Sequence, residues 1–180
     1  MNKIILSAFL MVTLLVSCNN QPSGPSETTK MNIASMNGID DAIQRKDFSK
    51  LGDFIAQDCI DHAGEHGDVV GLDSLKASLA GWVATVDEKT TVIKRLADDE
   101  YVMSWNQNSG KYLTEGQGHK VGDTFNLSGI DVVKFKDGKA VEHWMMMPPE
   151  DVVKMMSSTM APPVSTAPVM PSDSLKVKKH

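Results

Sequence analysis

The sequence predicts an α+β fold in which helices come first and a strongly curved antiparallel sheet of about four main strands follows. Between residues 33 and 86, apolar residues recur three and four positions apart, the spacing of amphipathic helices. From residue 88 the apolar period changes to two, which is typical of strands. Asp137-Gly138, between two β-rich segments, is a strong signal for a tight hairpin. Helices followed by a strand meander define the α+β class.

The amino-terminal segment predicts export and lipid attachment. After Lys3, an apolar run covers residues 4–16. At about 1.5 Å per residue it spans roughly 20 Å, less than the roughly 30 Å of a bilayer core, and such a run is typical of a signal peptide. The residues Leu15-Val16-Ser17-Cys18 resemble the lipobox of bacterial lipoproteins. The resemblance implies that residues 1–17 are removed and that Cys18 carries membrane lipid; the alternative is an ordinary signal peptide with an incidental cysteine.

Two polar segments flank the expected domain. Residues 18–30 are rich in Ser, Thr and Pro and predict a flexible tether. Residues 157–180 contain four prolines and predict a disordered tail. One domain, residues 31–156, remains between them. We expect a lipoprotein of the periplasm or cell surface, and Asn19, in place of the aspartate that often signals inner-membrane retention, favours the outer membrane.

The composition argues against a nucleic-acid partner and against an intrachain disulfide. The chain has 23 acidic and 18 basic residues, a net charge of −5, and no basic stripe. We therefore expect no nucleic-acid partner. The chain has two cysteines. With Cys18 lipidated, Cys59 has no partner for an intrachain disulfide.

Three helices are predicted in the first half of the domain. The first covers residues 33 to about 46, and a second, short one covers 48–55. Residues 58–62 form an extended segment that enters the Gly-rich loop 64–71. Asp73 is a suitable N-cap for a third helix, which ends near Val86. These helices can cover the concave face of the sheet.

The second half of the domain predicts β-structure. The β-rich segments are residues 91–96, 101–106, 111–118, 125–136 and 139–147. The segment 111–118 is the weakest because glycines bound it, and Gly129 is the expected site of a bulge. Two prolines stop the last strand, and residues 150–156 predict a short closing helix. A curved sheet covered by helices leaves a cone-shaped pocket between them.

Four blocks of the sequence resemble the SnoaL-like branch of the nuclear transport factor two-like superfamily. They are AIQRKDFSKL (42–51), DH (61–62), GLDSLK (71–76) and GIDVVKFKDGKAVEHW (129–144). The resemblance extends over residues 37–156. It implies a conical α+β barrel with a pocket, and a homodimer. The named activity of the family is an intramolecular aldol condensation that closes polyketide rings without a metal or an organic cofactor.

Such chemistry needs groups that remove and deliver protons inside a water-poor pocket. The candidate groups are Asp61, His62, Asp131, Glu142 and His143. We select His62, Asp131 and His143 as the catalytic set. Strand parity places Asp131 on the inner face, and it places Glu142 and His143 on opposite faces unless a bulge intervenes. Alternatively, His62 hydrogen-bonds the backbone at the loop entrance, and Asp131 caps amides near Gly129.

The sequence departs from its family at one position. SnoaL-like cyclases carry an acid/base aspartate three or four residues beyond the tryptophan of the Glu-His-Trp block, where this chain has Met147 and Pro148. This departure favours binding over catalysis.

Large apolar side chains could line the pocket. They are Trp82, Met103, Trp105, Trp144 and Met145. The alternative for each is ordinary core packing. No metal-ligand spacing is visible, so we expect neither a metal nor a cofactor. The favoured function is a membrane-anchored protein that binds a small apolar or carbonyl-containing molecule; the alternative is a cofactor-free cyclase, isomerase or hydrolase.

Overall fold

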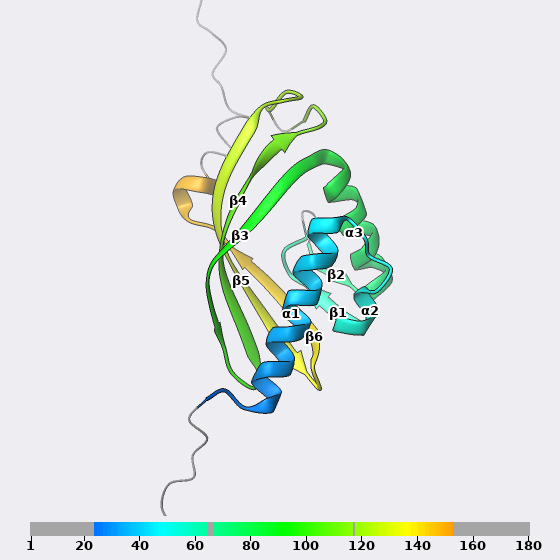
Figure 1. Cartoon of the computed structure of the whole chain (residues 1–180). Helices are drawn as coiled ribbons and strands as arrows, with labels where there is room; N and C mark the ends of the chain where they lie inside the picture. Colours follow the sequence, from blue (N-terminus) through cyan, green and yellow to red (C-terminus); the bar gives the residue numbers. More distant parts are fainter. Residues whose placement is uncertain (1–23, 65–66, 117, 153–180) are drawn as a thin grey trace, which may run out of the picture.

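The computed structural model of the chain describes residues 24–64, 67–116 and 118–152. Within these residues, three helices pack against one six-stranded sheet, and residues 149–152 add a further helical turn (Figure 1). The elements are α1 (Glu27–Arg45), α2 (Leu51–Phe54), β1 (Ile55–Asp61), β2 (Val69–Val70), α3 (Leu72–Thr85), β3 (Val86–Ala97), β4 (Tyr101–Tyr112), β5 (Thr124–Lys136) and β6 (Lys139–Met146). The α+β class is therefore confirmed.

The sheet is mixed, which corrects the expected antiparallel sheet of about four strands. Its order is β2-β1-β6-β5-β4-β3. Strands β3 to β6 form the expected antiparallel meander, but β1 pairs in parallel with β6 and β2 pairs with β1. Residues 58–62 were expected only as an extended segment, because nothing local to a strand identifies a partner about eighty residues away. This parallel pair matters for the site described below.

Two glycines have a different role from the one expected. Gly110 does not start a separate strand, because β4 continues through it to Tyr112. A Cβ at Gly110 would lie 2.2 Å from the carbonyl oxygen of Asp87, so the glycine permits close approach of β3 and β4. No bulge occurs at Gly129, which pairs regularly with Asn106. Register shifts fall elsewhere in the pairing, between Val92 and Lys94 for example.

The helices begin and end differently from the prediction. The side chain of Ser26 caps α1 by accepting a hydrogen bond from the amide of Thr29. The helix thus includes residues 27–30, which were assigned to the tether. Helix α2 has a single turn, and α3 begins directly after Gly71, so Asp73 lies in its first turn and is not its cap.

The predicted hairpin is confirmed. Asp137 and Gly138 have φ angles of 52° and 74°, and Lys136 pairs with Lys139 across the turn. A Cβ at Gly138 would lie 2.7 Å from the sulfur of Met31, so the turn also packs closely against α1.

The core lies between the helices and the concave face of the sheet, as Figure 1 shows. Its fully enclosed apolar residues are Met36, Ile39, Leu51, Ile55, Cys59, Leu72, Val102, Val133, Phe135 and Ala140. None of the helices in the described residues is long and apolar enough to cross a bilayer. Residues 149–152 are helical. The signal peptide, Cys18, the last residues of the predicted closing helix and the tail 157–180 lie outside the described residues.

Candidate functional site

A cavity of about 250 Å³ lies between α1, α3 and the concave face of the sheet. Its wall is mainly apolar, with Ile39 and Ile43 from α1 and Leu75 and Leu79 from α3. The sheet contributes several polar side chains to the same cavity. An apolar pocket with a few convergent polar groups is the usual form of a small-molecule site.

Three residues on neighbouring strands form a hydrogen-bonded triad at this cavity. His143 of β6 lies between Asp61 of β1 and Asp131 of β5. Its Nδ1 is 2.8 Å from Asp61 Oδ1, and its Nε2 is 3.2 Å from Asp131 Oδ1. Asp61 is the register partner of His143, so the parallel pairing of β1 with β6 completes the triad.

The triad holds a positive charge on its histidine. Burial by itself would lower the pKa of His143, but the hydrogen bonds and charges of Asp131 and Asp61 outweigh it and raise that pKa from 6.5 to about 9. Burial also raises the pKa of Asp61, yet His143 and the Ala63 amide together hold it below its ordinary value. At neutral pH the triad is an imidazolium between two carboxylates.

Two asparagines on β4 extend the polar surface. Asn106 is only 4% exposed, and its Nδ2 donates a hydrogen bond to Asp131 Oδ2. The Oδ1 atoms of Asn106 and Asn108 are buried and find no hydrogen-bond partner among the described residues. Both side chains line the cavity. The sequence analysis missed them, although polar residues at every second position after buried Val102 were an available signal.

Two further carboxyl groups line the cavity and were also missed. Burial raises the pKa of Glu88 on β3, despite hydrogen bonds from Thr90 and Trp82. Burial likewise raises the pKa of Asp40 on α1, although Arg95 Nη2 lies 2.6 Å from its Oδ2. The cavity therefore combines an apolar wall with an unusual number of acidic groups.

Of the three catalytic residues selected from the sequence, the structure brings two together. Asp131 and His143 meet at the cavity, and Asp131 shares its face with Val133, as strand parity predicted. His62 does not join them. Because Asp61 faces the cavity, its neighbour His62 points the other way and stacks on Trp144 with ring centroids 5.0 Å apart.

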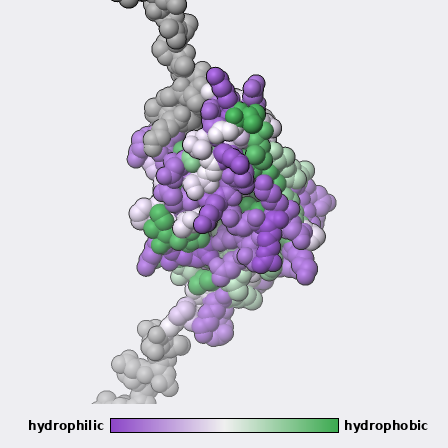
Figure 2. Space-filling view, turned by 45° about the horizontal axis from the view of Figure 1, so that its top comes forward, coloured by the Kyte–Doolittle hydropathy of each residue, from purple (hydrophilic) through white to green (hydrophobic). Residues whose placement is uncertain are grey.

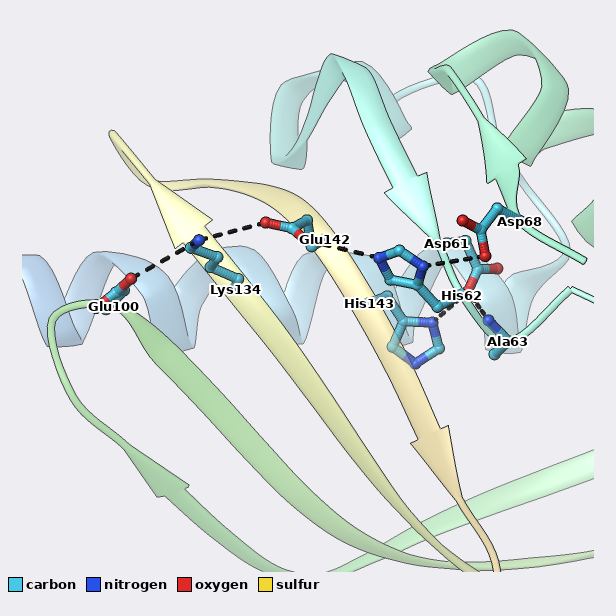
Figure 3. A network of polar contacts seen from close by, with 8 residues as sticks. All are labelled: Asp61, His62, Ala63, Asp68, Glu100, Lys134, Glu142 and His143. Atoms are coloured by element: carbon cyan, nitrogen blue, oxygen red, sulfur yellow. Dashed lines mark hydrogen bonds and ion pairs between the residues drawn. The ribbon is translucent and has the colours of Figure 1, made fainter.

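His62 belongs to a chain of ionic contacts that runs across β1, β6 and β5, drawn in Figure 3 together with His143 and Asp61. Its Nδ1 lies 3.0 Å from Asp68, and its Nε2 lies 3.6 Å from Glu142. Glu142 in turn lies 3.3 Å from Lys134. Glu142 also borders the cavity. Its carboxylate, however, accepts a hydrogen bond from Lys134 and does not contact the triad.

Only two of the five predicted pocket residues line the cavity. Trp82 and Met145 do. Met103, Trp105 and Trp144 are placed on the outer face of the sheet, which corrects their expected position. On β4, Val102 and Asn106 face inward, so Met103 and Trp105 must face outward, where they are 39% and 49% exposed. They are therefore neither pocket nor core residues.

In the described residues that directly follow β6, no carboxylate takes the place of the family's acid/base aspartate. Met147 and Pro148 follow β6 directly. The next acidic side chain with a defined contact, Asp151, is buried and accepts a hydrogen bond from the amide of Ser128 at 2.8 Å. No group of three His, Cys, Asp or Glu residues in the described part of the chain is arranged to hold a metal ion.

An α+β domain with a cavity on the concave face of its sheet defines the structural class, and the sequence defines the family. Residues 34–156 match the family model for SnoaL-like polyketide cyclase. The match covers more than half of the chain, and the protein belongs to this family. No curated protein matches the sequence significantly.

Solved structures share the fold. A protein from Jannaschia Sp. CCS1, provisionally assigned as a SnoaL-like polyketide cyclase, superposes with a TM-score of 0.67 at 14% identity, over 78% of this chain and 99% of that chain. An NTF2-like protein of unknown function from Burkholderia pseudomallei K96243 gives 0.59 at 13% identity, over 71% and 98%. An LEH-like epoxide hydrolase from M. tuberculosis gives 0.58 at 14% identity, over 73% and 93%. At such identities the likeness shows the fold alone.

Proposed function

We propose that the domain binds a small, mainly apolar molecule in the cavity and holds a polar group of that molecule against the triad. The observation that supports this most strongly is Asn106, a nearly fully buried side chain that lines the cavity and whose Oδ1 has no partner in the described structure. Leaving a buried acceptor unsatisfied is unfavourable. A ligand that supplies a donor would remove that penalty, whereas the apolar wall would bind the rest of the molecule.

A titration with cyclohexanone, a small apolar carbonyl compound, tests the binding. We expect amide chemical-shift changes confined to residues around the cavity. Leu79→Trp should fill the cavity and abolish them, because Leu79 lines it. Leu96→Trp makes the same substitution at a residue that is 60% exposed outside the cavity, and it should leave them unchanged. Changes that survive Leu79→Trp would contradict the proposal.

A second function is favoured by one further feature. Asp131 is a carboxylate oriented by hydrogen bonds from both His143 and Asn106. An oriented carboxylate can act as the general base in a cofactor-free cyclase, isomerase or hydrolase. His143 would then be a positioning residue, because an imidazolium with a pKa of about 9 does not accept a proton at neutral pH. Turnover of a carbonyl substrate lost in Asp131→Asn tests this function.

Membrane anchoring through Cys18 is also part of the proposal. It is supported by the lipobox-like sequence before Cys18. Mass spectrometry of the amino-terminal peptide from expressing bacteria should find a chain that begins at a lipid-modified Cys18. Cys18→Ser should move the protein from the membrane fraction to the soluble fraction. An unmodified terminus elsewhere in the chain would contradict lipidation.

We further propose that a second copy of the chain packs on the outer face of the sheet. Apolar residues there occupy paired register positions across β3 to β6; Leu96 pairs with Met103, and Trp105 pairs with Ile130. Helices α1 to α3 all lie on the opposite side (Figure 1). Figure 2 shows one side of the molecule coloured by hydropathy, on which apolar areas are interspersed among hydrophilic ones. A single such face can pair with itself about a two-fold axis.

A further inference from the structure

The unsatisfied polar atoms of the cavity are hydrogen-bond acceptors. They are Asn106 Oδ1 and Asn108 Oδ1. The orientation of the Asn106 amide follows from its neighbour, because the ionised carboxylate of Asp131 can only accept, so the Nδ2 of Asn106 must face it. The Oδ1 of Asn106 therefore remains an acceptor directed away from Asp131. A ligand that satisfies this part of the cavity must bring donors.

The cavity also carries an excess of negative charge. Asp40 is compensated by Arg95 at 2.6 Å, and Glu142 by Lys134 at 3.3 Å. The two carboxylates of the triad share one imidazolium. Glu88 forms no ion pair with any residue in the described ranges; it accepts hydrogen bonds from Thr90 Oγ1, at 3.2 Å, and from Trp82. The groups facing the cavity thus leave negative charge on the triad and on Glu88.

These acceptors and charges lie on one part of the concave face. Asn106 on β4 bonds directly to Asp131 on β5. Glu88 on β3 is the register partner of Gly110, and Asp131 on β5 is the register partner of Ser104, so both carboxyl groups lie on the same face, at opposite ends of the β4 segment that carries Asn106 and Asn108. The charge of Asp131 acts on Glu88 and contributes to raising its pKa. A cation bound beside Asp131 and Asn106 is therefore also attracted by the charge of Glu88.

We propose that the ligand of this cavity is a protonated amine on an apolar body, with its ammonium beside Asp131 and Asn106 and attracted by the charge of Glu88. The inference rests on the proposed binding function and specifies its ligand. A primary ammonium supplies three donors and a positive charge, a hydroxyl supplies one donor, and a carboxylate supplies none.

Three probes of matched shape test the ligand class. They are cyclohexylmethylamine, cyclohexylmethanol and cyclohexanecarboxylate, and calorimetry at pH 7 on the chain as purified from expressing cells measures their affinities. We expect the amine to bind about tenfold more tightly than the alcohol, because it makes charge-assisted hydrogen bonds, and the carboxylate to bind most weakly.

Two variants should show whether the charge of the cavity, and not its shape, accounts for amine binding. Glu88→Gln and Asp131→Asn should each weaken amine binding about tenfold and leave alcohol binding nearly unchanged, since they remove charge but little volume. Glu100→Gln is the matched control, because Glu100 is exposed outside the cavity and should not affect either probe. Thermal melting verifies that each variant is folded.

The outcomes distinguish this inference from the function on which it rests. Alcohol or carboxylate binding as tightly as the amine, or amine binding that both charge-removing variants leave unchanged, overturns the amine assignment. Binding of cyclohexanone without any binding of the amine overturns it as well, while the binding function stands. Failure of all four compounds to bind overturns both.

Discussion

The inner and outer faces of the sheet differ strongly, although their residues alternate along the same strands. On β5, Asp131 faces the cavity, and its neighbours Ile130 and Val132 face outward. On β6, His143 faces the cavity, and Trp144 stacks on His62 outside. The inner face thus carries charged side chains at the positions where a simple core would be apolar, and the outer face carries apolar ones.

This arrangement is informative because buried charges and exposed apolar residues are each unfavourable in an isolated domain that has only a structural role. Buried charges are retained where they are paired or functional. Contiguous exposed apolar residues typically mark an interaction surface. The difference between the faces therefore supports the proposed small-molecule site inside and the proposed second copy outside, and each can be tested separately.

The largest expected difference in stability is between substitutions of His143 inside the cavity and of His62 outside it. His143→Leu leaves Asp61 and Asp131 close together without the imidazolium between them, and we expect it to lower the free energy of unfolding by about 3 kcal/mol. His62→Leu removes solvent-accessible contacts to Asp68 and Glu142, and should cost less than about 1 kcal/mol. Chemical denaturation at pH 7 measures both.

A rescue variant controls this prediction. Adding Asp61→Asn to His143→Leu removes one of the two like charges, so part of the lost stability should return. Equal losses from the two histidine variants would contradict the assignment of His143 to a buried ionic site.

The pH dependence of stability should follow His143. Because its folded-state pKa is about 9 against an ordinary 6.5, its contribution is complete below about pH 6.5 and is lost as the pH rises through 9. The full shift corresponds to about 3 kcal/mol, and partial exposure reduces this to about 2 kcal/mol. Denaturation curves between pH 6 and 10 should show the loss in the wild type and little of it in His143→Leu. A flat wild-type profile would disprove the imidazolium.

The outer face can be tested by sedimentation. Trp105→Glu should weaken self-association by about 2 kcal/mol or more, because large aromatic residues dominate such interfaces. Trp82→Glu, a matched change at the cavity, should leave the dimer intact. A wild-type chain that sediments as a monomer at micromolar concentration would refute the homodimer.

The smallest expected effect concerns Glu88. Burial raises its pKa, so ionisation of Glu88 is less favourable in the folded than in the unfolded chain. Glu88→Gln should therefore increase stability at pH 7, by less than about 1 kcal/mol. Glu100→Gln should change little. A clear loss of stability in Glu88→Gln would mean that its charge is compensated in the fold.

Local rules predicted much of this molecule correctly. The hairpin at Asp137-Gly138 follows from the φ values that those two residues tolerate, and the shared face of Asp131 and Val133 follows from alternation. The change from helical to strand period placed α3 before the long strands of the meander. Each of these features depends on residues that are neighbours in the chain, and so it could be found in the sequence.

The same alternation also holds along β4, but there the prediction exchanged the inner and the outer residues. Met103 and Trp105 were placed inside because large apolar side chains are usually buried. Asn106 and Ser104, which share a face with Val102, occupy the inner positions instead. Parity states which residues lie together, and it does not state which of the two faces is covered by helices.

The order of elements, the tight hairpin and the family follow from the sequence, because short-range spacing and recognisable blocks carry them. The triad and the exclusion of His62 from it depended on the tertiary structure. Asp61 reaches His143 only because β1 inserts in parallel beside β6, more than eighty positions along the chain. Pairing over such a separation is selected by how the whole sheet and its helices pack, which no local pattern encodes.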